Sequence, residues 1–240
     1  MNRIIKTAAA LLAMILAAGL FFGCGAAKEG GETKPAADGS ESARESAPVG
    51  TEEEANVIPL PALDVGVTFS WGRFDQDGVP ENGAEPIEWT VLKEENGRYL
   101  AVSREALECM AFSASDKGDS WADSSVREWL NGEFFDGAFV AAEKELIPES
   151  GGDFIFLLSV GEAEELFEDD AARVAVGTEH AYKNGLFKTA GGGCWWWLRT
   201  PGEEKGNIAG VDANGVVSAR GNSAYRLTHA VRPAMWIKPD

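Results

Sequence analysis

The sequence CWWWLRTPG at residues 194–202 decides the fold prediction, because a run of aromatic and apolar residues ends there in a Thr-Pro-Gly stop. Such a run predicts a β-strand. Neighbouring strand residues point to opposite faces, so Trp195 and Trp197 share one side and Trp196 takes the other. One side must be core, while the second is either covered by another layer or open to solvent.

The residues after this stretch predict a hairpin and a closing strand. Asp-Ala-Asn-Gly at 212–215 separates the apolar segments 208–211 and 216–218, and Asn-Gly tolerates the positive φ of a tight turn. His-Ala-Val-Arg-Pro-Ala-Met-Trp-Ile at 229–237 predicts a final strand. Since short turns join antiparallel neighbours, we expect the late strands to pair antiparallel in one sheet.

Earlier residues add strands and helices. Alternating patterns predict strands at 65–71, 87–92 and 99–102, with a hairpin turn at 94–97. Two capping boxes, each a serine followed three residues later by a glutamate, predict helix starts. They are Ser125 with Glu128, and Ser159 with Glu162 for a helix through 165–167. The first helix presents one apolar face, made of Val126, Trp129, Leu130 and Phe134. Helices between two sets of strands predict an α+β domain.

The N-terminus predicts export and a lipid anchor. Arg3 and Lys6 precede an unbroken apolar run at 8–22, which is shorter than the roughly 20 residues of a membrane-spanning helix and fits a signal peptide. Gly23-Cys24 closes the run like a bacterial lipobox, so we expect the Cys24 sulfur to be acylated. The alternative is an ordinary signal cleaved at 17–19.

A polar tether follows the predicted anchor. Residues 25–56 hold 3 basic and 8 acidic side chains, no aromatic residue and a single aliphatic one, Val49. A segment this poor in apolar surface does not offset the entropy of ordering. We therefore expect a signal peptide at 1–23, the lipidated cysteine and a disordered tether at 24–61, and one globular domain at 62–240. We expect the protein to bind the membrane through the lipid anchor, with the domain facing the extracellular, cell-wall side.

Several motifs recur in order along the predicted domain. They are PIEWxVL at 86–92, VRxWLN at 126–131 with FF at 134–135 and AF at 138–139, DxIFLLS at 153–159 with EAE at 162–164, CWWWLRTPG at 194–202, and VRPAMWI at 231–237. Together they resemble the DUF6273 family, a domain of unknown function common in secreted and surface proteins of gut and soil Firmicutes. The chain departs from the family pattern at 69–72, where Phe-Ser-Trp-Gly stands for a Phe-Gly-x-Tyr-like start.

The resemblance also implies a fold. The family's ending is similar to the closing section of C-type-lectin-like and formylglycine-generating-enzyme-like domains, which implies a single C-type-lectin-like domain with antiparallel sheets and about two main helices. A fold likeness transfers no activity. A formylglycine-generating oxidase needs a close pair of cysteines, and Cys194 has no cysteine downstream. Cys109 and Cys194 either form a disulfide or remain buried thiols.

Composition and motifs exclude several function classes. A formal net charge of −18 over 240 residues repels phosphate backbones, so nucleic acid is not expected as a partner. No nucleophile, phosphate-loop or zinc signature is present, so we assign no catalytic residue, no metal and no cofactor. The two histidines, His180 and His229, are interpreted as structural. Asp-x-Asp-Gly at 75–78 and Asp-x-Asn-Gly at 212–215 are interpreted as turns rather than calcium loops.

The aromatic content points to a binding surface. Trp195 and Trp197 beside Arg199 would offer a platform for a sugar ring or peptide if their face is open. Arg232 is interpreted first as the partner of a buried carboxylate, and otherwise as a ligand contact. We therefore expect a non-catalytic, surface-anchored module that binds glycan or peptide. The alternatives are an extracellular carboxylate-dependent hydrolase acting on glycan or peptide, and an accessory domain without a small ligand.

The lipid anchor gives a first testable prediction. Mass spectrometry of the native protein should find an acylated cysteine at position 24 as the N-terminal residue, and Cys24→Ala should move the protein from the membrane fraction to the soluble fraction. A mature chain that begins at any other residue would contradict this prediction.

Overall fold

The computed structural model describes residues 57–114 and 120–239. The predicted signal peptide and Cys24, and the tether up to residue 56, lie outside the described residues. Within the described part of the chain, no helix has the length and apolar character required to cross a bilayer.

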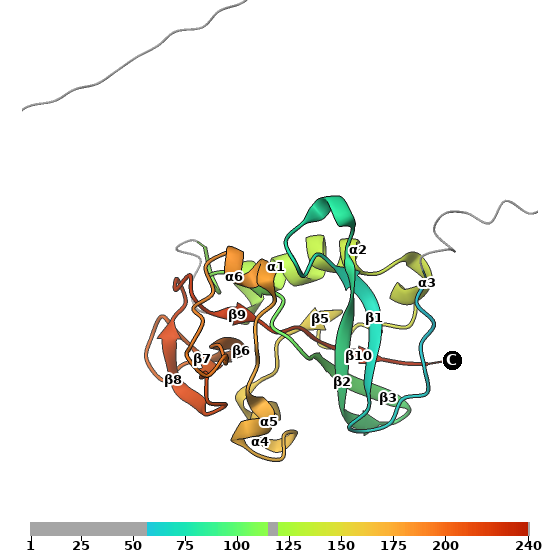
Figure 1. Ribbon diagram of the computed structural model, residues 1–240. Helices are drawn as coiled ribbons and strands as arrows, with labels where there is room; N and C mark the ends of the chain where they lie inside the picture. The colour runs from blue at the N-terminus through green and yellow to red at the C-terminus, as the bar shows by residue number, and fades with distance from the viewer. Residues whose placement is uncertain (1–56, 115–119, 240) are drawn as a thin grey trace, which may run out of the picture. The chain divides into compact units, whose positions relative to one another are not determined.

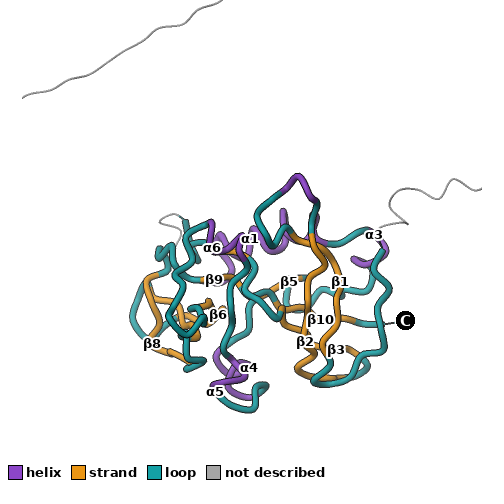
Figure 2. The backbone as a smooth tube through the Cα atoms, viewed as in Figure 1, coloured by secondary structure: helices purple, strands orange, loops and turns teal. Residues whose placement is uncertain are grey.

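Two five-stranded sheets form the framework (Figures 1 and 2). The first has the order β1-β2-β3-β10-β5 and is antiparallel throughout. Its strands are β1 (Thr68–Phe74), β2 (Glu85–Glu95), β3 (Arg98–Ser103), β10 (Ala234–Ile237) and β5 (Ile155–Phe156). The second has the order β4-β9-β6-β7-β8. Its strands are β4 (Glu108–Cys109), β9 (Ala230–Val231), β6 (Trp196–Pro201), β7 (Asn207–Val211) and β8 (Val217–Ser223).

The helices are short and lie between strands. One nearly continuous helical segment consists of α1 (Ser125–Trp129), the π-helical turn η4 (Leu130–Phe134) and α2 (Phe135–Ala138). The others are η2 (Pro80–Asn82), η3 (Trp121–Asp123), α3 (Ala141–Lys144), α4 (Val160–Glu165), α5 (Asp170–Arg173) and α6 (Glu179–Lys183). The predicted α+β class is confirmed, whereas the C-type-lectin-like detail stays a prediction.

Local signals placed the hairpins and helix starts well. Asn96 and Gly97 both have positive φ, 55° and 72°, as a tight β2–β3 turn requires. The β7–β8 hairpin turns at 212–215 as predicted. The Ser159–Glu162 capping box is present. The first helix differs by one residue, because Ser124 rather than Ser125 caps it.

The closing segment 229–237 is not one strand, so the prediction of a single late sheet is wrong. β9 lies in the second sheet, where it pairs parallel with β6, and β10 lies in the first sheet between β3 and β5. Arg232 and Pro233 separate them. Proline has no N–H to donate to a strand ladder, and the Pro233 carbonyl instead accepts a hydrogen bond of 2.8 Å from the Ser103 amide. The last strand therefore crosses from one sheet to the other at this point.

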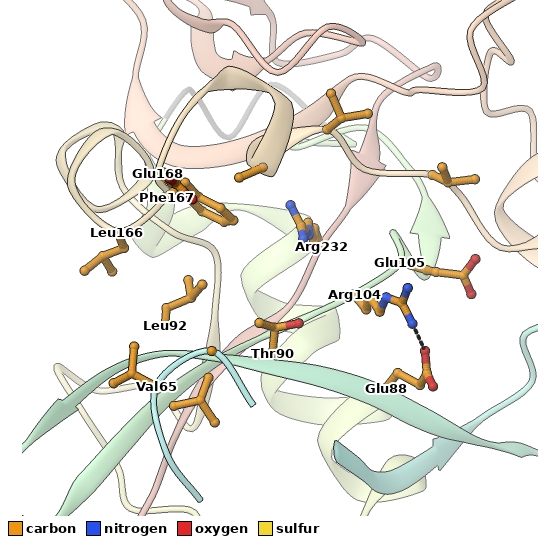
Figure 3. A pocket seen from close by; sticks show the side chains of 15 residues that line it. Val65, Glu88, Thr90, Leu92, Arg104, Glu105, Leu166, Phe167, Glu168 and Arg232 are labelled. Atoms are coloured by element: carbon orange, nitrogen blue, oxygen red, sulfur yellow. Dashed lines mark hydrogen bonds and ion pairs between the residues drawn. The ribbon is translucent and has the colours of Figure 1, made fainter. Parts of the chain in front are cut away.

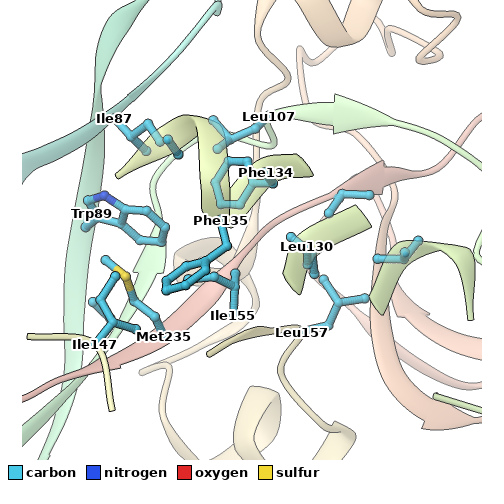
Figure 4. Packing of buried hydrophobic residues seen from close by; sticks show 14 of the residues in the cluster. Ile87, Trp89, Leu107, Leu130, Phe134, Phe135, Ile147, Ile155, Leu157 and Met235 are labelled. Carbon is cyan, nitrogen blue, oxygen red and sulfur yellow. The ribbon is translucent and has the colours of Figure 1, made fainter. Parts of the chain in front are cut away.

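Two hydrophobic cores result from this arrangement. In the first core, the helical segment packs against the inner face of the first sheet, and Figure 4 shows Leu130, Phe134 and Phe135 on the side facing Trp89 and Met235. The second core contains the opposite face of β3 and β10 together with one face of β6.

Strand β6 contributes to both cores. Trp197 is fully buried in the first core, and Trp196 is fully buried in the second. The predicted alternation of neighbouring tryptophans is confirmed. The sequence left the second face of this strand either covered or open, and it is covered, because both tryptophans are fully buried.

Trp197 should contribute more to stability than Trp129, because it is more deeply buried. Trp197 is 0% exposed and packs on Phe112 at a centroid distance of 6.0 Å. Trp129 is half-buried at the edge of the first core. We predict that Trp197→Ala lowers the free energy of unfolding by about 3–5 kcal/mol, the range for large core aromatics, and that Trp129→Ala lowers it by less. Urea unfolding of both variants checks this, and an equal or larger loss for Trp129→Ala would contradict it.

Candidate functional site

A cleft of about 820 Å³ lies between β2 and the segment from Leu166 to Val176. Strand β2 turns Ile87, Trp89 and Val91 into the first core. Its alternate side chains, Glu88, Thr90 and Leu92, line the cleft. The opposite wall consists of Leu166, Phe167, Glu168, Ala172, Val174 and Val176. Figure 3 shows Leu92, Val65 and Leu166 toward one end and Glu88, Arg104 and Glu105 toward the other.

Arg232 lies between these two ends, close to Thr90 and Phe167 in Figure 3. Its side chain is buried, and its Nε donates to the Ser103 carbonyl at 2.8 Å while Nη1 donates to the Arg173 carbonyl at 3.2 Å. The guanidinium also lies 5.1 Å from the Trp196 ring centroid and 5.5 Å from that of Phe167. At these distances the electron-rich ring faces attract the positive charge. Burial lowers the pKa of Arg232 to about 10, so it remains a cation at neutral pH.

The expected carboxylate partner of Arg232 is not formed, and that prediction is wrong. Among the residues that the structure describes, no carboxylate pairs with Arg232, and its Nη2 has no hydrogen-bond acceptor. Nη2 is not fully enclosed by protein, and Arg232 lines the cleft. Backbone carbonyls and aromatic rings take the place of the carboxylate, and the N–H groups of Nη2 are left without an acceptor among the described residues, in a side chain that lines the cleft.

Carboxylates form the polar end of the cleft. Glu88 and Arg104 form an exposed ion pair of 2.9 Å. Glu105 is exposed, but its carboxyl group is partly desolvated, and this desolvation, followed by the charge of Glu88, raises its pKa above the ordinary value. Two carboxylates with different surroundings thus face the same space.

A second cavity of about 630 Å³ adjoins this end and shares Glu88, Glu105 and Val176 with the cleft. Its remaining carboxylates are Asp77, Glu85 and Glu179, and its cation is Lys188, which lies 4.7 Å from the Tyr182 ring. The cleft and this cavity are therefore neighbours that meet at three residues; together they are called the groove, and the second half of the groove is acidic.

The structure does not bring the predicted site residues together. Trp197 is buried and offers no open platform, and Trp195 is half-buried against His229 at a centroid distance of 5.2 Å. Arg199 donates a hydrogen bond of 2.9 Å from Nη2 to the Glu162 Oε1, its Nη1 forms an ion pair of 2.7 Å with Oε2, and it lines a separate small cavity. Of the four predicted residues, Arg232 lies in the cleft.

The Arg199–Glu162 pair fastens β6 to the start of α4. Burial alone would raise the pKa of Glu162, but the hydrogen bonds from Arg199 and Ser159 outweigh it and the pKa lies below its ordinary value. We interpret this half-buried, bidentate arginine–carboxylate contact as structural. The role of Arg199 as a ligand contact stays a prediction without support from its surroundings.

Sequence reasoning missed most of the cleft. Glu88 and Thr90 alternate with core residues along β2, a pattern that could have identified a second, outward face of that strand. Glu105 and Phe167 carry no local signal, because the fold brings them to the cleft from the loop after β3 and from the loop after α4.

The two described cysteines, Cys109 and Cys194, are buried free thiols. Burial raises the pKa of each to about 12, so neither is a thiolate at neutral pH. Of the two interpretations of these cysteines, the free-thiol one holds.

The carboxylates first interpreted as turn formers accept backbone hydrogen bonds. The Asp75 Oδ1 accepts from Gly78 and the Asp212 Oδ1 from Asn214, at 2.6 and 2.8 Å. Asp75, Asp77 and Glu85 lie close enough to share an ion, but each already accepts hydrogen bonds within its own turn or strand end.

The protein is an α+β domain with a cleft between strand β2 of its first sheet and the segment 166–176. The model of the DUF6273 family, a domain of unknown function, matches residues 96–239, and the chain belongs to this family. The matched region begins at the β2–β3 turn and contains Arg232, whereas β1 and β2 precede it. No curated protein and no solved structure matches the chain.

His229 gives a prediction about pH. Its ring stacks on Trp197 at a centroid distance of 4.3 Å, and within the described part of the chain both its nitrogens lack partners. Burial, and after it the charge of Arg226, lowers the pKa of His229 from 6.5 to about 4. The folded state therefore favours the neutral form of His229. The free energy of unfolding should fall by up to about 3 kcal/mol as the pH drops from above 6.5 toward 4.

Urea unfolding at pH 7.5 and 4.5 measures this loss, with His229→Phe as the matched variant because phenylalanine stacks but does not titrate. The wild type should lose about 2–3 kcal/mol more than His229→Phe between the two pH values. Equal losses in the two proteins would contradict the prediction.

Proposed function

We propose that the protein is a surface-anchored lipoprotein whose domain is a non-catalytic binding module, and that it holds a glycan or peptide ligand in the cleft between β2 and the segment 166–176. The N-terminal sequence supports the anchor. The cleft supports the binding role, since its volume of about 820 Å³ lies within the range of about 300–1,000 Å³ of ligand sites.

The buried guanidinium of Arg232 is the observation that carries this proposal. Removing a charge from water costs several kcal/mol unless partners compensate, and here neutral carbonyls and rings are the partners in the described residues. Apolar walls beside a small number of directed polar groups are typical of ligand sites. An unused donor at such a place favours binding of an external acceptor over a purely structural role.

A carboxylate-dependent hydrolase is the second candidate, and Glu105 favours it. A glycosidase needs one carboxyl group with a raised pKa as the acid and a second, ionised carboxylate. Glu105, whose pKa partial desolvation and Glu88 raise, and Glu88, which pairs with Arg104, line the same cleft. In this candidate Glu105 protonates the leaving group and Glu88 acts as nucleophile or base.

A blocked cleft tests the site. Val176 is 44% exposed and borders both halves of the groove, so Val176→Trp should fill the junction. Val216, 46% exposed in the β7–β8 turn, gives the matched control Val216→Trp. We predict that glycans or peptides selected by the full wild-type chain from arrays bind Val176→Trp at least ten-fold more weakly and Val216→Trp unchanged. Equal binding by Val176→Trp would contradict the proposed site.

Chromatography of the recovered ligand separates the two candidates. An intact ligand supports the binding module. A cleaved ligand, with cleavage lost in Glu105→Gln, would replace it by the hydrolase.

A further inference from the structure

The first half of the groove contains the buried cation Arg232, and the second half is acidic. Arg232 presents its free Nη2 in the first half, where Thr90 adds a hydroxyl and Phe167 an aromatic face. The second half holds Asp77, Glu85 and Glu179 against a single lysine, Lys188. Glu88 and Glu105 line the junction.

The first half suits a carboxylate. The guanidinium of Arg232 is fixed by two carbonyl oxygens and two aromatic rings, so little conformational freedom remains to be lost on binding. A hydrogen bond between charged partners in a desolvated place is among the stronger polar contacts of proteins. Arginine presents several N–H groups in a plane, a geometry that matches carboxylate oxygens.

The surroundings disfavour an anion without a compensating cation. The chain has a formal net charge of −18, and Glu88, Glu105 and Glu168 line the same cleft as Arg232. Like charges at short range oppose binding. A ligand that also carries a cation for the acidic half avoids this repulsion, whereas a neutral glycan uses neither half and an acidic glycan only one.

We infer that the ligand is a short peptide with a free C-terminal carboxylate on Arg232 and a basic group in the acidic half of the groove. This inference rests on the proposed function and specifies its ligand class. The part of the peptide between the two charged groups passes Thr90 in the cleft and Val176 at the junction.

Paired peptide libraries test the inference. Random acetylated tetrapeptides with free C-terminal acids, and the same peptides as amides, are offered to the full chain in nonionic detergent. We predict at least ten-fold stronger retention of the acid library, since a charge-assisted hydrogen bond contributes about this much, and enrichment of Lys and Arg. Equal retention of acids and amides, or retention of neither library, overturns the inference.

Two variants separate the halves. Arg232→Gln should abolish the difference between acids and amides. Glu179→Lys, at an exposed position of α6, should reduce the enrichment of basic residues several-fold while the preference for acids persists, and this variant does not disturb the core. Glu203→Lys makes the same charge change at an exposed site outside the groove and should leave both preferences unchanged. Loss of the basic preference in both lysine variants would assign it to net charge and overturn the second half of the inference.

The outcome also separates this inference from the proposed function. Binding of glycans that is lost in Val176→Trp, together with no retention of peptides, would keep the cleft as a ligand site and reject the peptide. Absence of any ligand sensitive to Val176→Trp would reject both.

Discussion

The fold depends on the place where the last strand leaves one sheet and enters the other. There Arg232 ties the end of β3, through the Ser103 carbonyl, to α5, through the Arg173 carbonyl. The Ser103 amide in turn bonds the Pro233 carbonyl. Burying a charge without a carboxylate partner has an unfavourable free energy of desolvation. The carbonyl dipoles and the Trp196 and Phe167 rings offset much of it. Both sheets and the helical wall of the cleft meet at this residue.

The same contacts connect stability with binding. Two donors of the guanidinium hold the sheets and α5 in place, and the remaining Nη2 faces the cleft. A ligand carboxylate there would add the countercharge that the fold lacks. Binding should then stabilise the folded state in proportion to the logarithm of ligand concentration, because the site does not exist in the unfolded chain.

The sequence predicted best what depends on neighbouring residues. Asn96-Gly97 and the Asp212–Gly215 turn form hairpins because their backbone requirements are local, and the same holds for the Ser159–Glu162 capping box. Gly215 shows how local and distant demands coincide, since a Cβ there would come within 1.7 Å of the Asp170 carbonyl oxygen.

What the sequence could not predict depends on residues far apart in the chain. The partners of Arg232 are 129 and 59 residues away, so a buried carboxylate was the general expectation and backbone carbonyls the outcome. The sequence left the face of Trp197 either covered or open, and it is covered because two cores lie on the two sides of β6. The apolar pattern of the closing segment is uniform and does not show where it divides. Packing places β9 in the second sheet and β10 in the first.

The most direct test is a high-resolution crystal structure of the chain without added ligand, in which the surroundings of Arg232 are resolved. The account predicts the Ser103 and Arg173 carbonyl oxygens on Nε and Nη1, and water or an anion from the solution on Nη2. A carboxylate of this chain on Nη2, such as that of Glu105 or Glu168 from the walls of the cleft, would contradict it.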